Sequence, residues 1–194
     1  MRIGICGGTF DPFHRGHLDP VLAARETMQW DRVLYIPAWR QPFKTHLDAA
    51  PGAHRFAMAA LAIRDHEALY VSPIELDRGG VSYSVDTLDE LHRQFPGASF
   101  DWIIGDDNLA DLDRWKDTER LFQLARFVVL SRTGVEDRES RLKPNIVFAH
   151  NATVPISSTE IRSRVRGGLP IDAFVDPLVS RYIHHYGLYK EGQS

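Results

Sequence analysis

The chain has 194 residues, of which 43% are hydrophobic and 25% are charged, values that are ordinary for a folded globular protein and exclude wholesale disorder. The formal net charge is −3, so the chain lacks the global basic field that is typical of proteins that bind duplex nucleic acid. One cysteine, Cys6, cannot form an internal disulfide, no apolar run approaches the roughly 20 residues that cross a bilayer, and the first residues lack the apolar stretch of a signal peptide, so we expect a cytoplasmic protein that is not bound to a membrane.

Short apolar or β-branched runs recur along the chain and predict buried strands at 2–6, 32–36, 68–72, 100–104, 127–130 and 146–148. Helical patterns lie between these runs, at 16–29, 53–65, 85–95 and 118–125. The alternation predicts the α/β class: a Rossmann-like, doubly wound and mainly parallel sheet with helices on both faces.

Two C-terminal helices are predicted after the last strand. Ser157 begins one of them and is followed three places later by Glu160, which is the spacing of a capping box, while Asp176-Pro177 begins the other. Gly167 and Gly187 are suitable residues to end these two helices. Because no repeat, linker or charge run marks a boundary, we expect residues 1–194 to form a single domain.

The segment that follows the first predicted strand reads GGTFDPFHRGH, at 7–17. In open sheets of this class, ligands bind beyond the carboxyl ends of the strands, where the strand order reverses. Gly7 and Gly8 allow the backbone to approach a ligand closely, and the amides at the start of the following helix attract anions. We therefore expect Gly7 and Gly8 to line a phosphate site.

His14 and His17 are three residues apart in the same segment, so both imidazoles can point into one crevice and donate hydrogen bonds to phosphate oxygens. Two other interpretations stay open on the residues alone. The glycines can form a tight turn beside solvated histidines, or Asp11, His14 and His17 can bind a metal ion.

The segment ISSTEIR, at 156–162, begins the penultimate helix. Hydroxyl groups, helix-start amides and the guanidinium of Arg162 converge there, which predicts a second phosphate clamp that includes Ser157. The alternative is an ordinary capping box with solvated arginines.

Together these two segments resemble the nucleotidyltransferase superfamily that carries an H-x-G-H signature and is related in fold to the class I aminoacyl-tRNA synthetases. The second segment matches the I-S-S-T-x-I-R signature of the same superfamily. Further segments narrow the resemblance to the bacterial nicotinate mononucleotide adenylyltransferases: 32–44, SYSVDTL at 82–88, IGDD at 104–107 leading to Trp115, and YIHHYGLY at 182–189.

This resemblance implies the reaction ATP + nicotinate mononucleotide → deamido-NAD + pyrophosphate, with Mg²⁺ held mainly by the phosphates of ATP. It implies no nucleic-acid partner. The catalytic residues are then His14, His17 and Arg162. The ATP site adds Gly7, Gly8, Thr9, Gly105, Asp106 and Ser157, and the acceptor site has Lys44, Tyr83, Ser84 and Trp115.

Two positions depart from the family pattern. Phe43 stands where the family usually has a histidine before the lysine, and Ser84 replaces a threonine. Cys6 is expected to behave as a small hydrophobe. Asp86 and Thr87 are expected to serve the helix start, with the side chains of Asp86 and Asp89 directed away from the acceptor pocket.

Three other functions are weighed against this one. Sister transferases that act on phosphopantetheine or transfer a cytidylyl group would share the H-x-G-H loop. A noncatalytic nucleotide-binding module would keep the clamps without turnover. RNA binding, suggested by the kinship with synthetases, lacks a broad basic surface.

Overall fold

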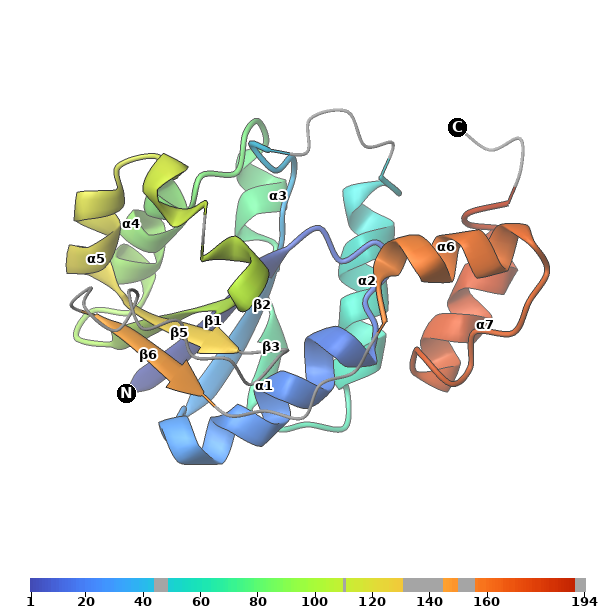
Figure 1. The fold of residues 1–194 in the computed structure, drawn as a ribbon, viewed down its shortest axis with the longest axis horizontal. Coiled ribbons are helices and arrows are strands. Elements are labelled where there is room, and N and C mark those ends of the chain that lie inside the picture. The colour runs from blue at the N-terminus through green and yellow to red at the C-terminus, as the bar shows by residue number, and fades with distance from the viewer. Residues whose placement is uncertain (44–48, 110, 131–144, 150–155, 191–194) are drawn as a thin grey trace.

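In a computed structural model of the chain, the described residues are 1–43, 49–109, 111–130, 145–149 and 156–190. They form one sheet in the order β3-β2-β1-β4-β5-β6 (Figure 1). Its strands are β1 (Arg2–Gly8), β2 (Arg32–Pro37), β3 (Leu69–Val71), β4 (Ser99–Gly105), β5 (Arg126–Leu130) and β6 (Ile146–Ala149). Every pairing between these strands is parallel, so the predicted fold class is confirmed.

The helices confirm the predicted alternation and add elements that the sequence patterns did not predict. Those predicted are α1 (Arg15–Met28), α2 (Gly52–Ile63), α4 (Ser84–Gln94), α5 (Thr118–Leu124), α6 (Ser158–Arg166) and α7 (Pro177–Tyr186). The additional elements are α3 (Ile74–Arg78) and two short 3₁₀ helices at Asp106–Asn108 and Leu112–Arg114. These three are too short to show a helical hydrophobic period, and so they were missed.

Two hydrophobic clusters lie on opposite faces of the sheet. Successive strand residues point to opposite faces, so Phe127 belongs to one cluster and Val128 to the other. Residues of α3, α4 and α5 belong to the cluster that contains Phe127, while residues of α1, α2, α6 and α7 belong to the cluster that contains Val128. The sheet is therefore covered on both sides, as a parallel sheet requires.

The predicted helix ends are also confirmed. Ser157 Oγ accepts a hydrogen bond from the Glu160 amide at 3.2 Å, and Asp176 Oδ1 accepts one from the Leu178 amide at 2.8 Å. Gly167 and Gly187 follow α6 and α7, and Gly187 has the left-handed φ of 65° that favours glycine.

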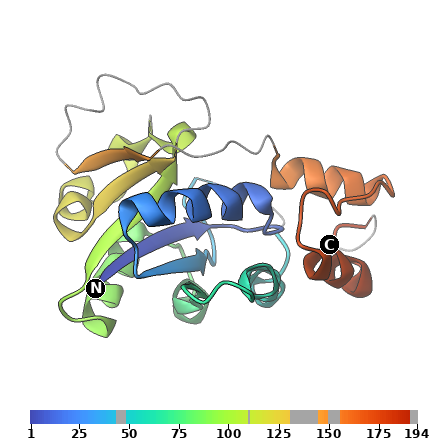
Figure 2. The ribbon, with the colours of Figure 1, turned by 90° about the horizontal axis from the view of Figure 1, so that it is seen from below.

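Helices α6 and α7 lie to one side of the sheet, past α2 (Figures 1 and 2). The amide of Arg15, at the start of α1, donates to the carbonyl of Phe174 between the two C-terminal helices, at 2.9 Å. This arrangement brings the start of α6 to the loop that follows β1, although the two are far apart in sequence.

Candidate active site

A cleft of about 980 Å³ opens at the carboxyl ends of β1 and β4, where the strand order reverses. Nearly all the predicted site residues line it: Gly7, Gly8, Thr9, His14, His17, Tyr83, Ser84, Gly105, Trp115, Ser157 and Arg162. Asp106 follows Gly105 in the first 3₁₀ helix, but the cleft is lined there by Gly105, Asp107 and Asn108. Lys44 lies outside the described residues.

Close contacts explain why glycine, which has no Cβ, occupies two positions in this cleft. A Cβ on Gly8 would lie 2.8 Å from Cε1 of Phe10, and a Cβ on Gly105 would meet the Asp107 carboxylate. Phe10 itself has a positive φ of 53°, a strained conformation for a bulky residue. Its ring packs against Phe13 and Tyr35, with centroids 5.3 and 5.9 Å away, so aromatic contacts hold the loop in this shape.

His14 and His17 form a stacked pair at the start of α1, with ring centroids 3.8 Å apart. The His14 amide donates to Nδ1 of His17 at 3.3 Å. A neutral ring that accepts at Nδ1 carries its proton on Nε2, which makes His17 Nε2 a hydrogen-bond donor. A Cβ on Gly16 would lie 2.9 Å from Cε1 of His14, so the glycine between the histidines makes room for the stack.

Asp11 lies beside the histidines in sequence, but its carboxylate is used differently. It is 4% exposed, and its Oδ1 accepts hydrogen bonds from the Tyr189 hydroxyl at 2.7 Å and the Ala50 amide at 3.2 Å. Within the described ranges, no three side chains of the metal-binding types come together at a possible metal site. The contacts of Asp11 therefore favour a structural role over the metal alternative.

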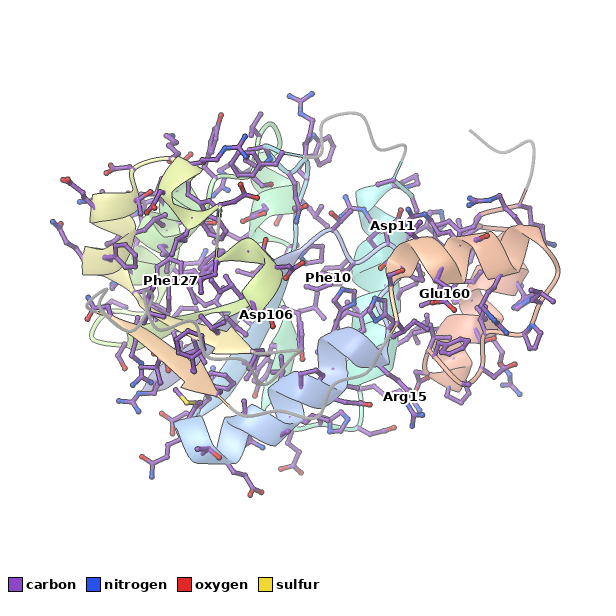
Figure 3. The ribbon with its side chains drawn as sticks, viewed as in Figure 1. Phe10, Asp11, Arg15, Asp106, Phe127 and Glu160 are labelled. Carbon is purple, nitrogen blue, oxygen red and sulfur yellow. The ribbon has the colours of Figure 1, made fainter. Side chains whose placement is uncertain are left out.

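Arg162 on α6 is directed toward the loop after β1. Its Nη1 donates to the carbonyl oxygen of Asp11 at 2.7 Å and lies 3.8 Å from the Asp11 carboxylate. Ser158 Oγ donates to the Pro12 carbonyl at 3.1 Å in the same region. Figure 3 shows Asp11 beside α6, where Glu160 is labelled. The two predicted phosphate-binding segments thus meet at one end of the cleft.

Arg55 and Tyr189 support this junction; no motif indicated Arg55, and Tyr189 ends the family segment 182–189 without any predicted contact to this loop. Arg55 is 3% exposed and donates from Nη1 to the Thr9 carbonyl and from Nε to the Ala50 carbonyl, both at 2.8 Å. Burial lowers the pKa of Arg55, while the neighbouring Asp11 carboxylate opposes that shift. Burial and the same carboxylate raise the pKa of Tyr189, so its hydroxyl stays protonated and donates to Asp11.

The opposite end of the cleft is formed by the start of α4 and by Trp115. Tyr83 precedes the helix, and its side chain does not cap the first-turn amides. Ser82 joins this turn to the segment after β2, because its Oγ accepts from the Trp39 amide at 3.0 Å and its amide donates to the Arg40 carbonyl at 2.9 Å. In that segment Phe43 is 54% exposed and lies under the Arg114 guanidinium, 5.2 Å from its ring centroid.

Two further side chains in the cleft had no clear signal in the sequence. Glu75 on α3 is 4% exposed and accepts from Thr87 Oγ1 at 2.6 Å; burial raises the pKa of Glu75, although hydrogen bonds from Thr87 and Ser82 oppose the shift. Thr87 thus joins α4 to α3, beyond its expected role at the helix start. Lys116 lines the cleft directly after Trp115.

Cys6 also borders the cleft, and burial raises the pKa of its thiol to about 12. The thiol is therefore protonated near neutral pH and is not a nucleophile, in agreement with the expectation from the sequence.

No helix in the described part of the chain has the length and apolar character that crossing a membrane requires.

The sequence of the chain is similar to those of a known protein family. Residues 5–164 match the family model described as "Cytidylyltransferase-like". Two curated relatives, one from Roseiflexus sp. (strain RS-1) and one from Thermus thermophilus, are each named "Probable nicotinate-nucleotide adenylyltransferase". They are 43% and 42% identical to this chain, covering 97% and 98% of it and 98% and 100% of their own lengths.

Solved structures show the same fold. The Plasmodium falciparum nicotinic acid mononucleotide adenylyltransferase complexed with NaAD has a TM-score of 0.78 and is 21% identical, covering 97% of both chains. The same enzyme complexed with APC has a TM-score of 0.76, at 21% identity over 97% of this chain and 96% of that one. At this identity the likeness supports the architecture.

Proposed function

The chain belongs to the cytidylyltransferase-like family, and from the names of its full-length relatives we propose that it is a nicotinate-nucleotide adenylyltransferase of NAD biosynthesis. The enzyme joins the AMP moiety of ATP to nicotinate mononucleotide and gives deamido-NAD and pyrophosphate. Relatives that share this name over nearly the full length of the chain favour it over the sister transferases that carry the same H-x-G-H loop.

The observation that carries the proposal is the convergence of two distant segments on one cleft. His14 and His17 lie at the start of α1, and Ser157 and Arg162 lie at or near the start of α6, yet all four line the same cavity. Imidazole and guanidinium donors together with helix-start amides form a strong polyanion site. A triphosphate fits this donor set.

We assign the nucleotide and its phosphates to the end of the cleft between β1 and β4. Gly7, Gly8 and Thr9 would contact the phosphates through the backbone, and the segment from Gly105 to Asn108, which contains Asp106, would contact the nucleoside. Mg²⁺ is proposed to enter with ATP, held mainly by phosphates and water. When bound, the ion neutralises triphosphate charge.

The chemistry needs alignment and charge stabilisation, with no covalent enzyme intermediate. A phosphate oxygen of the mononucleotide forms a bond to the α-phosphorus of ATP, and the bond from that phosphorus to the bridging α–β oxygen breaks. The electron pair leaves with pyrophosphate. Nε2–H of His17 would donate to oxygens that gain charge in the transition state, and Arg162 with Ser157 would hold the departing phosphates.

The acceptor is assigned to the end of the cleft between α4 and Trp115. The indole can stack on the pyridine ring. The first-turn amides of α4 and the hydroxyl of Ser84, beside Tyr83, can receive the nicotinate carboxylate. Lys44 stays a proposed contact from the family pattern.

A coupled pyrophosphate assay tests the function. With ATP, the protein is expected to release pyrophosphate on addition of nicotinate mononucleotide and to form deamido-NAD, with much lower rates for phosphopantetheine, or for glycerol phosphate with CTP. Binding of ATP without turnover on any acceptor would instead support a noncatalytic nucleotide-binding module.

Nicotinate mononucleotide is expected to be preferred over its amide counterpart by about 30-fold in kcat/KM. Hydrogen bonds to a charged acceptor contribute roughly 1.5–3 kcal/mol against about 1 for neutral ones, and the amide would turn its own NH₂ toward donors. Measuring kcat/KM for both acceptors at fixed ATP checks this. Equal efficiency would show that the start of α4 does not recognise the carboxylate.

The packing supports the proposal that residues 1–194 form one domain, because α6 and α7 share a hydrophobic cluster with α1 and α2. The partners of the site are small molecules, ATP and the mononucleotide. The need for ATP favours the cytoplasm as the place of action.

A further inference from the structure

Lys116 connects the two walls of the acceptor end of the cleft. It follows Trp115 on one wall, and its Nζ lies 3.0 and 3.1 Å from the two carboxylate oxygens of Asp86, in the first turn of α4 on the other wall. The same ammonium lies 4.6 Å from the centroid of the Tyr83 ring. Lys116 lines the cleft, and its side chain is 48% exposed.

Asp86 poses an electrostatic problem for the proposed substrate. It is two residues after Ser84, whose amide is assigned to the nicotinate carboxylate. An unpaired carboxylate there would repel a second one, and repulsion between like charges acts over several ångströms when both are partly shielded from solvent. An acid substrate is therefore favoured more strongly there when the charge of Asp86 is balanced.

We propose that Lys116 strengthens the preference for an acid acceptor by neutralising Asp86. With the ion pair formed, the local charge is zero and the first-turn amides of α4 dominate the field at the carboxylate. Without the ammonium the local charge becomes −1, which disfavours the acid and leaves the neutral amide substrate nearly unaffected. This inference rests on the proposed function and deepens it.

The chain offers a matched control on the same helix. Asp89, three residues after Asp86, pairs with Arg120 on α5 at 2.6 Å. The arginine is 47% exposed, close to the value for Lys116, but neither partner lines the cleft. Removing this second ion pair tests the general cost of losing an α4 ion pair, separately from any effect on the acceptor.

The experiment compares kcat/KM for nicotinate mononucleotide and its amide in five proteins: wild type, Lys116→Met, Asp86→Asn, the double variant and Arg120→Met. Methionine keeps an unbranched apolar stem over the Tyr83 ring and removes the charge. Lys116→Met is expected to lower the acid value about three- to tenfold and to change the amide value less than about twofold. Asp86→Asn is expected to raise the acid-to-amide ratio, and the double variant to return it close to wild type.

Several results would overturn the inference: an unchanged ratio in Lys116→Met, an equal fall for both acceptors, or a double variant as impaired as Lys116→Met. Arg120→Met is expected to leave the ratio unchanged, and a matching fall there would also count against the inference. If Lys116→Met folds poorly, Asp86→Asn still tests the inference, because removing the negative charge is expected to raise the acid-to-amide ratio. A wild type that uses neither acceptor would contradict the proposed function itself, whereas an active wild type with insensitive variants would contradict this inference alone.

Discussion

Replacing His17 with alanine is expected to lower kcat by about 100- to 1,000-fold, which is the usual effect of losing one preorganised donor in a transition state. In the structure the Nδ1 of His17 accepts from the His14 amide, so its Nε2 is the donor that would meet the reacting phosphates. Pyrophosphate release under saturating substrates measures the effect. His14→Ala is expected to lower turnover similarly, with an added loss of thermal stability because His14 is only 4% exposed.

His17→Asn is the matched control for this prediction. The asparagine oxygen can take the position of Nδ1 and accept from the His14 amide, but nothing replaces Nε2. The variant is expected to melt near the wild-type temperature and to be as slow as His17→Ala. Turnover close to wild type in all three variants would remove the histidines from the mechanism, and zinc bound stoichiometrically by the wild type and lost on mutation would revive the metal alternative.

The elements that could be predicted are those whose signals are local. Strand runs, helix periods and caps such as Ser157 and Asp176 depend on residues close in sequence, and each lies where its pattern indicated. Asp101 shows the limit of this approach. It lies within the predicted strand 100–104 yet is 2% exposed, because Trp30 and Arg126 donate to its carboxylate from elsewhere in the chain. A buried charge of this kind needs partners that local sequence does not reveal.

The candidate site also has parts that could be predicted from local sequence and parts that could not. The loop after β1 and the start of α6 could be predicted, because each motif carries its own glycines, histidines or hydroxyls. Their junction could not, since Tyr189 reaches Asp11 across 178 residues and Arg55 reaches Thr9 across 46. Neither Asp86 nor Asp89 lines the cleft, but the Asp86 carboxylate reaches toward it and pairs with Lys116, which does line it. The cations that pair with them, Lys116 and Arg120, were not foreseen.

This junction gives Arg162 two roles that mutation must separate. Its Nη1 holds the Asp11 carbonyl at 2.7 Å, and its side chain lines the cleft with 19% of its surface exposed. A guanidinium can bind a backbone carbonyl with one nitrogen and phosphate oxygens with the others, which an ammonium cannot do with the same geometry. In the proposed function, the residue would therefore connect the shape of the loop after β1 to the triphosphate.

Arg162→Ala is expected to weaken ATP binding by about 100-fold or more, because two charge-assisted hydrogen bonds to phosphate contribute roughly 1.5–3 kcal/mol each. Titration calorimetry with ATP measures the affinity, and the pyrophosphate assay measures the accompanying fall in turnover. A loss of thermal stability is also expected, since the Asp11 carboxylate loses a neighbouring cation and its carbonyl loses a donor.

Arg162→Lys separates the two roles. It keeps the positive charge near Asp11 and should recover most of the thermal stability, while ATP affinity and turnover recover only in part, because lysine cannot reproduce the two-pronged contact. Full recovery of both by lysine would mean that charge alone is needed at this position. Unchanged ATP affinity together with unchanged turnover in Arg162→Ala would mean that α6 does not hold the phosphates, and that the contact between Arg162 and Asp11 serves only to attach α6 to the loop after β1.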